Sequence, residues 1–129
     1  MTSTAHANPF SYSLDIYHTL GYIHVVAKGC GSKDDIANMY QTIKKTADTT
    51  KLNKLLLNVT ELTLGYSGSD VLKVLNVIKQ LFSHMYIARV VDPADFKSDL
   101  IETFAQKHTM NIKSFFNENV AYDWLVNKP

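Results

Sequence analysis

Hydroxyl groups and glycines are concentrated in one short segment of this sequence. Residues 65–70 follow the apolar run at 55–57 and precede an amphipathic pattern that begins near Val71. Glycine lets backbone amides approach a ligand closely, and the free amides at a helix start attract anions. We therefore expect a docking partner or an anionic group to bind this loop. The predicted binding residues of the loop are Tyr66, Ser67, Gly68 and Ser69.

Polar residues also lie at or just past the carboxyl ends of predicted strands. They are Lys28, Asn58, Thr60 and Asp92. In open α/β sheets this edge carries the ligand crevice, so we add Asn58, Thr60 and Asp92 to the predicted binding site. The alternative is that Asp92 and the following proline form a simple turn.

Other reactive side chains give weaker signals. Cys30 lies between two glycines near a helix start, where a thiolate would be stabilised, but we expect a buried structural thiol. The histidines make no pair at ligand spacing, so no metal site is predicted. Arg89 interrupts an apolar strand, and we expect it at an open edge of the sheet. The alternative is a partly buried ion pair with Asp15 or Asp92.

Composition excludes several classes of protein. The 129 residues carry a net charge of +1 with a single arginine, whereas a protein that binds nucleic acid needs a dense cationic surface. No apolar run is long enough for a membrane span, and the lone cysteine favours a reducing cytoplasm. We expect a flexible tail at residues 1–9 and one domain at residues 10–129. Neither a cofactor nor a catalytic signature is predicted.

Hydrophobic periodicity predicts an α/β fold. After an N-terminal hairpin, helices and strands alternate at short intervals, which is typical of crossover units. Ser32 and Asp35 form a capping box, and Gly29 to Gly31 are expected to end the preceding strand. The predicted strands cover residues 12–17, 22–28, 55–59, 86–91 and 112–116, and the predicted helices begin near Ser32, Ser69, Asp95 and Asn117.

Two of the helices carry specific expectations about burial. The last helix should turn Val120, Ala121, Trp124 and Leu125 toward the sheet. In the second helix, Leu72 and Val77 widen the apolar surface beyond one stripe, which indicates a second burial partner. We expect a homodimer formed through that helix.

Two segments of the second half resemble a known family. They are Tyr86-Ile87-Ala88-Arg89-Val90-Val91-Asp92 and Phe115-Phe116-Asn117-Glu118-Asn119-Val120-Ala121-Tyr122-Asp123-Trp124-Leu125. In their order of elements and in these motifs, residues 12–126 resemble the SpoIIAA-like family of the STAS superfamily. The resemblance implies a mixed, mostly parallel five-stranded sheet packed with four helices. It also implies no catalysis for most members, and a relation both to anti-sigma-factor antagonists and to lipid-carrying Sec14-like domains.

The resemblance also suggests a phosphorylation site. In the antagonists a kinase phosphorylates the second serine of an Asp-Ser-Ser-Gly motif at a helix start. Counting from Asn58, that position falls on Gly68 here, with Ser67 and Ser69 on either side. Either serine is a possible phosphorylation site, but we expect a helix cap instead.

The leading functional hypothesis is a non-enzymatic regulatory or ligand-binding domain that acts through protein contact. The alternative is a carrier of a small apolar or lipid-like ligand, held between the second and third helices and the sheet. The expected partner is thus a protein or a small apolar or anionic ligand. An enzyme ranks third.

Overall fold

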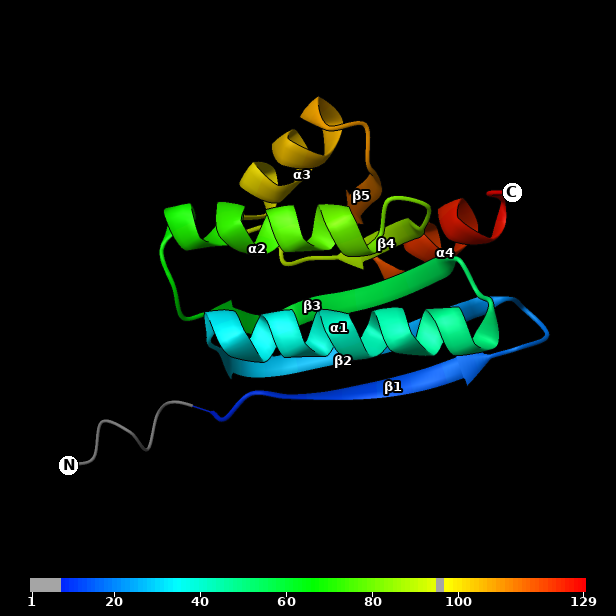
Figure 1. Ribbon diagram of the computed structural model, residues 1–129, viewed down its shortest axis with the longest axis horizontal. Coiled ribbons are helices and arrows are strands. Elements are labelled where there is room, and N and C mark those ends of the chain that lie inside the picture. Colours follow the sequence, from blue (N-terminus) through cyan, green and yellow to red (C-terminus); the bar gives the residue numbers. More distant parts are fainter. Residues whose placement is uncertain (1–7, 95–96) are drawn as a thin grey trace.

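The computed structural model describes residues 8–94 and 97–129, with the side chains of 97–99 left out (Figure 1). The elements are β1 (Ser11–Tyr17), β2 (Tyr22–Gly31), α1 (Lys33–Thr50), β3 (Lys54–Leu64), α2 (Gly68–Leu81), β4 (Tyr86–Val90), α3 (Lys97–Lys107), β5 (Asn111–Phe115) and α4 (Glu118–Val126). The expected cap at Asp95 lies outside the described residues.

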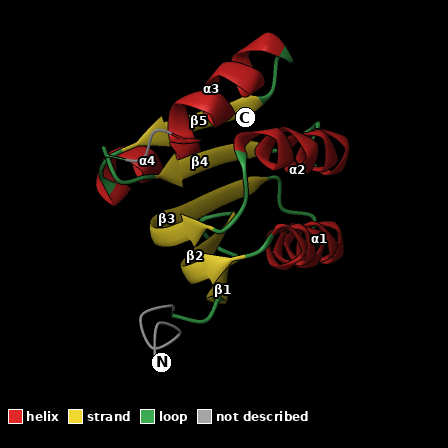
Figure 2. Ribbon diagram, turned by 90° about the vertical axis from the view of Figure 1, so that its left-hand side faces the viewer, coloured by secondary structure: helices red, strands yellow, loops and turns green. Residues whose placement is uncertain are grey.

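The strands form one sheet in sequence order, β1-β2-β3-β4-β5. β1 pairs with β2 as an antiparallel hairpin, and all later pairs are parallel. Parallel neighbours joined by right-handed crossovers keep their helices on the same face of a sheet. Accordingly α1 and α2 lie together on one face, α3 packs against α2 and β5, and α4 covers the opposite face (Figure 2). The predicted fold class is confirmed.

The two faces of the sheet bury separate cores. Leu55 and Leu57 of β3 point toward α1 and α2, and Leu56 points toward α4. This explains the continuous apolar run, because a strand covered on both faces needs apolar residues at successive positions. The core on the α4 face is smaller and centres on Ala121 and Leu125, which are both fully buried.

The expectation for α4 was correct for only part of its apolar face. Ala121 and Leu125 are in the core, and Trp124 is half-buried against Phe115 and Tyr86. Val120, in contrast, is 54% exposed. α4 has only nine residues, and Glu118 in its first turn contacts the polar side chains of Asn58 and His24 instead of an apolar surface.

Strands β2 and β3 are longer than predicted. β2 advances from Val26 to Lys28 while β3 advances from Asn58 to Glu61, so β3 carries one extra residue at a bulge. Beyond the bulge the two strands pair again up to Gly31 and Leu64. The glycines of β2 therefore do not end the strand. Gly29 has a φ of 84°, and a side chain there would collide with the backbone of residue 9.

Two of the predicted helix caps are present, whereas the expected serine cap of α2 makes no side-chain capping bond. Ser32 and Asp35 form the predicted capping box, in which the Asp35 amide donates to Ser32 Oγ at 3.1 Å and the Ser32 amide donates to Asp35 Oδ2 at 3.0 Å. Asn117 caps α4 by accepting from the amides of Asn119 and Val120. These caps satisfy amides that have no partner inside a helix.

The wide apolar surface of α2 has an intramolecular explanation. α2 contacts both α1 and α3, which covers more than one stripe of the helix. Val77 is half-buried, and Leu72 is 40% exposed. The homodimer therefore stays a prediction.

Most of the predicted tail, residues 1–9, lies outside the described residues. The Asn8 carbonyl accepts a hydrogen bond from the Cys30 amide at 2.9 Å, so residue 8 is tied to the end of β2. Within the described part of the chain, no helix has the length and apolar character that crossing a bilayer requires.

Leu125 and Val120 give a direct test of how α4 packs. Leu125→Ala should lower the free energy of unfolding by about 2–5 kcal/mol, since it leaves a cavity in the smaller core. Val120→Ala, in the same helix, should change it by less than about 0.5 kcal/mol because Val120 is largely exposed. Urea unfolding measures both values. Similar losses for the two variants would contradict the packing described here.

Candidate functional site

A pocket opens between the sheet and the three helices that share its larger core. α1, α2, α3, β3, β4 and β5 all contribute to its walls, and together with its open mouth it spans about 610 Å³. The lining residues are Ile36, Tyr40, Val59, Leu62, Leu64, Tyr66, Val71, Val74, Leu75, Ile78, Ile87, Arg89, Ile101 and Ile112. We call this cavity the Arg89 pocket, after the one charged side chain among these described lining residues. Part of that space is open solvent, and the mainly apolar lining is that of small-molecule sites.

Arg89 is buried inside this pocket, contrary to expectation. β4 lies between β3 and β5, so Arg89 is not at an open edge, and its side chain is only 5% exposed. The predicted ion pair is also absent, since no carboxylate of the described residues pairs with it. Its Nη1 atom donates a long hydrogen bond of 3.5 Å to Ser114 Oγ on β5, and its Nε atom has no hydrogen-bond partner.

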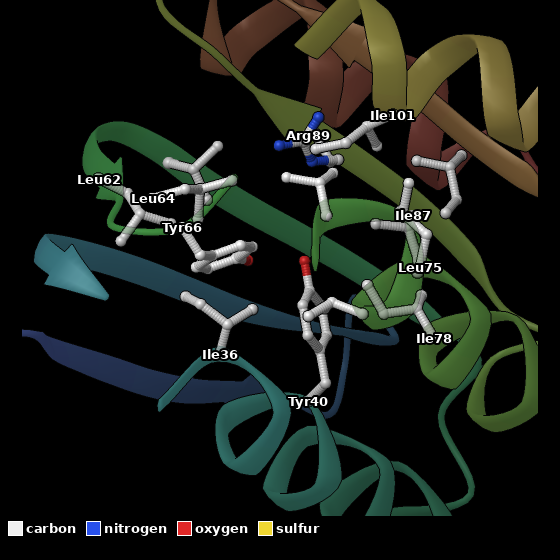
Figure 3. A pocket seen from close by; sticks show the side chains of 14 residues that line it. Ile36, Tyr40, Leu62, Leu64, Tyr66, Leu75, Ile78, Ile87, Arg89 and Ile101 are labelled. Carbon is white, nitrogen blue, oxygen red and sulfur yellow. The ribbon is translucent and has the colours of Figure 1, made fainter. Parts of the chain in front are cut away.

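Two tyrosines bring hydroxyl groups into the same pocket. Figure 3 shows the Tyr40 hydroxyl directed from α1 toward Arg89, with the Tyr66 ring on the other side of the cavity. Burial raises the pKa of Tyr40, and the charge and hydrogen bonding of Arg89 oppose that shift only in part. Burial likewise raises the pKa of Tyr66 far above its usual value, with a smaller contribution from Tyr40. Both hydroxyls are therefore protonated at neutral pH.

The serines of the predicted loop directly follow Tyr66, which lines this pocket. Ser67 occupies the N-cap position of α2, but its side chain makes no capping bond. Instead its Oγ atom lies 3.0 Å from Ser69 Oγ, and both residues are exposed. At Gly68 an added Cβ atom would meet only Leu100 at an ordinary 3.9 Å. Of the loop residues, Tyr66 lines the pocket and Ser67, Gly68 and Ser69 lie outside its walls.

Asn58 and Thr60 belong to a different site on the other face. They lie inside β3 at the bulge, and Asn58 Oδ1 accepts hydrogen bonds from the Thr60 amide at 3.0 Å and hydroxyl at 2.8 Å. Asn58 Nδ2 donates to Glu118 Oε2 at 2.7 Å, and His24 Nε2 lies 3.3 Å from the same oxygen. These four residues, the Glu118 cluster, join β2, β3 and α4. Their bonds stabilise the bulge and the start of α4.

Two further candidates have structural explanations. Asp92 Oδ1 accepts a hydrogen bond from the Ala94 amide at 2.9 Å, as expected for the turn alternative. Cys30 is exposed, so the expectation of a buried thiol was wrong. α4 packs on β3, β4 and β5 and leaves the end of β2 uncovered, which accounts for this exposure. Among the described residues, no three histidine, cysteine or acidic side chains could share a metal ion.

The predicted site residues are thus divided between two faces of the sheet. Only Tyr66 belongs to the Arg89 pocket, whereas Asn58 and Thr60 join the Glu118 cluster. The described walls of the pocket contain one cation, two phenols and many aliphatic side chains, a combination suited to an apolar molecule with one acceptor group. Arg89 was the available signal, since it interrupts an apolar strand. Tyr40 could not be recognised, because its helix pattern already explained it as a core residue.

Comparisons with known proteins identify the fold. No protein-family model matches the sequence, and no curated protein matches it. The structure is similar to an uncharacterised DUF3478-family protein with a SpoIIAA-like fold from Shewanella loihica, at 18% identity and a TM-score of 0.62. That match covers 97% of this chain and 98% of the other.

Two further similar structures come from other bacteria. One is an anti-sigma factor antagonist from Mycobacterium paratuberculosis, with 15% identity, a TM-score of 0.63, and coverage of 91% of this chain and 94% of the other. The second is the Bacillus cell fate determinant SpoIIAA in its phosphorylated form, with 11% identity, a TM-score of 0.54, and coverage of 88% and 98%. The chain therefore has the SpoIIAA-like fold that its motifs suggested.

The buried Tyr40 hydroxyl predicts a stability that falls in alkaline solution. Its raised pKa keeps the folded state protonated above pH ~10, where the unfolded chain ionises, so this contribution is lost as pH rises. Tyr40→Phe should reduce the alkaline slope by up to about 1.4 kcal/mol per pH unit. Urea unfolding from pH 6 to 11 measures how the free energy of unfolding changes with pH. The native protein and Tyr40→Phe should show the same slope below pH ~9. Equal slopes above pH ~10 would show that the hydroxyl is not buried.

Proposed function

We propose that this protein is a non-catalytic ligand-binding domain that holds a small, mainly apolar molecule in the Arg89 pocket. The single observation that carries this proposal is the apolar cavity between the sheet and α1, α2 and α3. It lies in the region expected for the carrier alternative, with α1 as an additional wall. Apolar walls of this kind gain affinity for a small ligand from the apolar area removed from water.

The polar groups of the pocket support binding rather than catalysis. Arg89 is permanently protonated, and the raised pKa values of Tyr40 and Tyr66 make both phenols poor general bases at neutral pH. The remaining walls are mainly aliphatic. Such groups orient a ligand through hydrogen bonds without taking a proton from it.

Filling the pocket tests the proposal. Leu62 is a half-buried wall residue, and Leu62→Trp should weaken binding of the neutral apolar probe N-phenyl-1-naphthylamine by about tenfold or more, since the indole occupies the same space. Saturable fluorescence titration measures the affinity. Leu20→Trp is the matched control, because Leu20 is 50% exposed on the hairpin turn, and it should bind the probe as the native protein does.

Two results would count against this function. One is the absence of saturable probe binding by the native protein, and the other is an unchanged affinity in folded Leu62→Trp. Native mass spectrometry of protein purified from its own host adds an independent measurement. A carrier should retain additional mass there, and Leu62→Trp should lose it.

A second candidate function is regulation through protein contact, and the exposed start of α2 favours it. Ser67 and Ser69 are accessible where α2 begins, and Asp70 pairs with Lys73 at 3.5 Å. A phosphate on either serine would meet the free amides and the positive end of the helix. The similar structures include an anti-sigma factor antagonist and a phosphorylated SpoIIAA.

Charge substitution measures whether this helix start favours an anion. Ser69→Asp, in the first turn of α2, should raise the free energy of unfolding by about 0.3–1 kcal/mol at low salt. Ser83→Asp, just past the other end of α2, should lower it by a similar amount, because the helix dipole is reversed there. Urea unfolding at low and high ionic strength compares the two. A loss of stability in Ser69→Asp would contradict a favourable phosphate position.

A further inference from the structure

The buried guanidinium of Arg89 is incompletely compensated by the residues that the structure describes. The side chain is 5% exposed, its Nε atom has no partner, and its Nη1 bond to Ser114 is 3.5 Å long. An arginine stays protonated in proteins, so it cannot relieve its burial by losing a proton. Buried charges are normally paired with an opposite charge. In the described part of the chain no carboxylate supplies that charge.

The surroundings of Arg89 favour an anion of a particular kind. Among the described residues a single cation faces the pocket, so a ligand with one negative charge would neutralise it, whereas a doubly charged phosphate would leave an uncompensated buried charge. A carboxylate also matches the planar guanidinium and accepts two parallel hydrogen bonds from it. The Tyr40 hydroxyl, directed toward Arg89, is a further donor for the same group (Figure 3).

The rest of the pocket favours an aliphatic chain attached to that carboxylate. Leu62 and Leu64 of β3 and Leu75 and Ile78 of α2 line it without offering a charge (Figure 3). Apolar walls of this kind gain free energy from covering methylene groups and none from a hydrated polar ligand.

We propose that the Arg89 pocket binds a medium-chain carboxylate, with the carboxylate on the Arg89 guanidinium and the aliphatic chain between β3 and α2. This inference rests on the proposed function, because it names the ligand class of the same cavity. It assigns Arg89 as the anchor of the head group and Tyr40 as an additional donor. Among the described residues, the Arg89 guanidinium thus gains a carboxylate partner only when the ligand is bound.

Isothermal titration calorimetry with four matched probes tests the ligand class at neutral pH. Octanoate should bind at least about tenfold more tightly than octanol, which has a similar chain but no charge. Octylamine, which places a second cation beside Arg89, should bind more weakly than octanol. Acetate should bind far more weakly than octanoate because it has no chain to bury.

Substitutions test whether Arg89 causes the preference for octanoate over octanol. Arg89→Gln should reduce octanoate affinity by about tenfold or more while leaving octanol within about threefold. Lys28→Gln is the matched control, because it removes an exposed cation outside the pocket and should leave both affinities unchanged. If Arg89→Gln does not fold, Tyr40→Phe serves instead, and it should weaken octanoate by about threefold or more without weakening octanol.

The outcomes separate this inference from the proposed function. Equal affinity for octanoate and octanol would contradict the inference that the ligand carries a carboxylate, but it would leave the proposed apolar binding site intact. If acetate binds as tightly as octanoate, the inference that the ligand carries an aliphatic chain is wrong. If neither octanoate nor octanol binds and the neutral fluorescent probe also fails to bind, the proposed function itself is wrong. Octanoate preference that survives in folded Arg89→Gln overturns the assignment of Arg89.

Discussion

Three helices share one face of the sheet because of the handedness of crossover connections. Each parallel strand is added beside the previous one, so every right-handed crossover returns over the same face. This face consequently carries a thick core, in which three helices meet the sheet. α4 follows the last strand and is the helix that covers the opposite face, where the core is smaller. The pocket lies on the crowded face, where packing of three helices leaves a space that their side chains do not fill.

The placement of Arg89 in this core has a cost for folding, and in the proposed function it has a use for binding. A buried charge without a full set of partners destabilises the empty protein, and an aliphatic residue at the same position would pack more favourably. Positions that break a local rule of packing are those at which function is to be expected. Asn58, by contrast, is a polar residue whose bonds stay inside the chain, with Thr60 and Glu118. The two polar positions therefore have different physical meanings although both interrupt apolar strands.

The two candidate functions use neighbouring parts of one structure. Tyr66 lines the pocket, and Ser67 follows it at the start of α2. A ligand in contact with Tyr66 would restrict the loop that presents Ser67 and Ser69 to a partner. Binding and protein contact are therefore compatible, and a domain of this kind could join them through a few residues of backbone.

Local signals in the sequence determined most of the fold. Ser32, Asp35 and Asn117 identified helix starts because capping depends on residues within three positions. The run at residues 55–57 identified a doubly covered strand, because burial on both faces leaves no polar position. Only the tertiary structure decided the rest. Arg89 is buried because β5 pairs with β4 on the side away from β3. The length of β3 depends on a bulge against β2. The exposure of Val120 and Cys30 depends on which strands α4 covers. Each of these follows from contacts between residues distant in the chain, which periodicity and capping do not report.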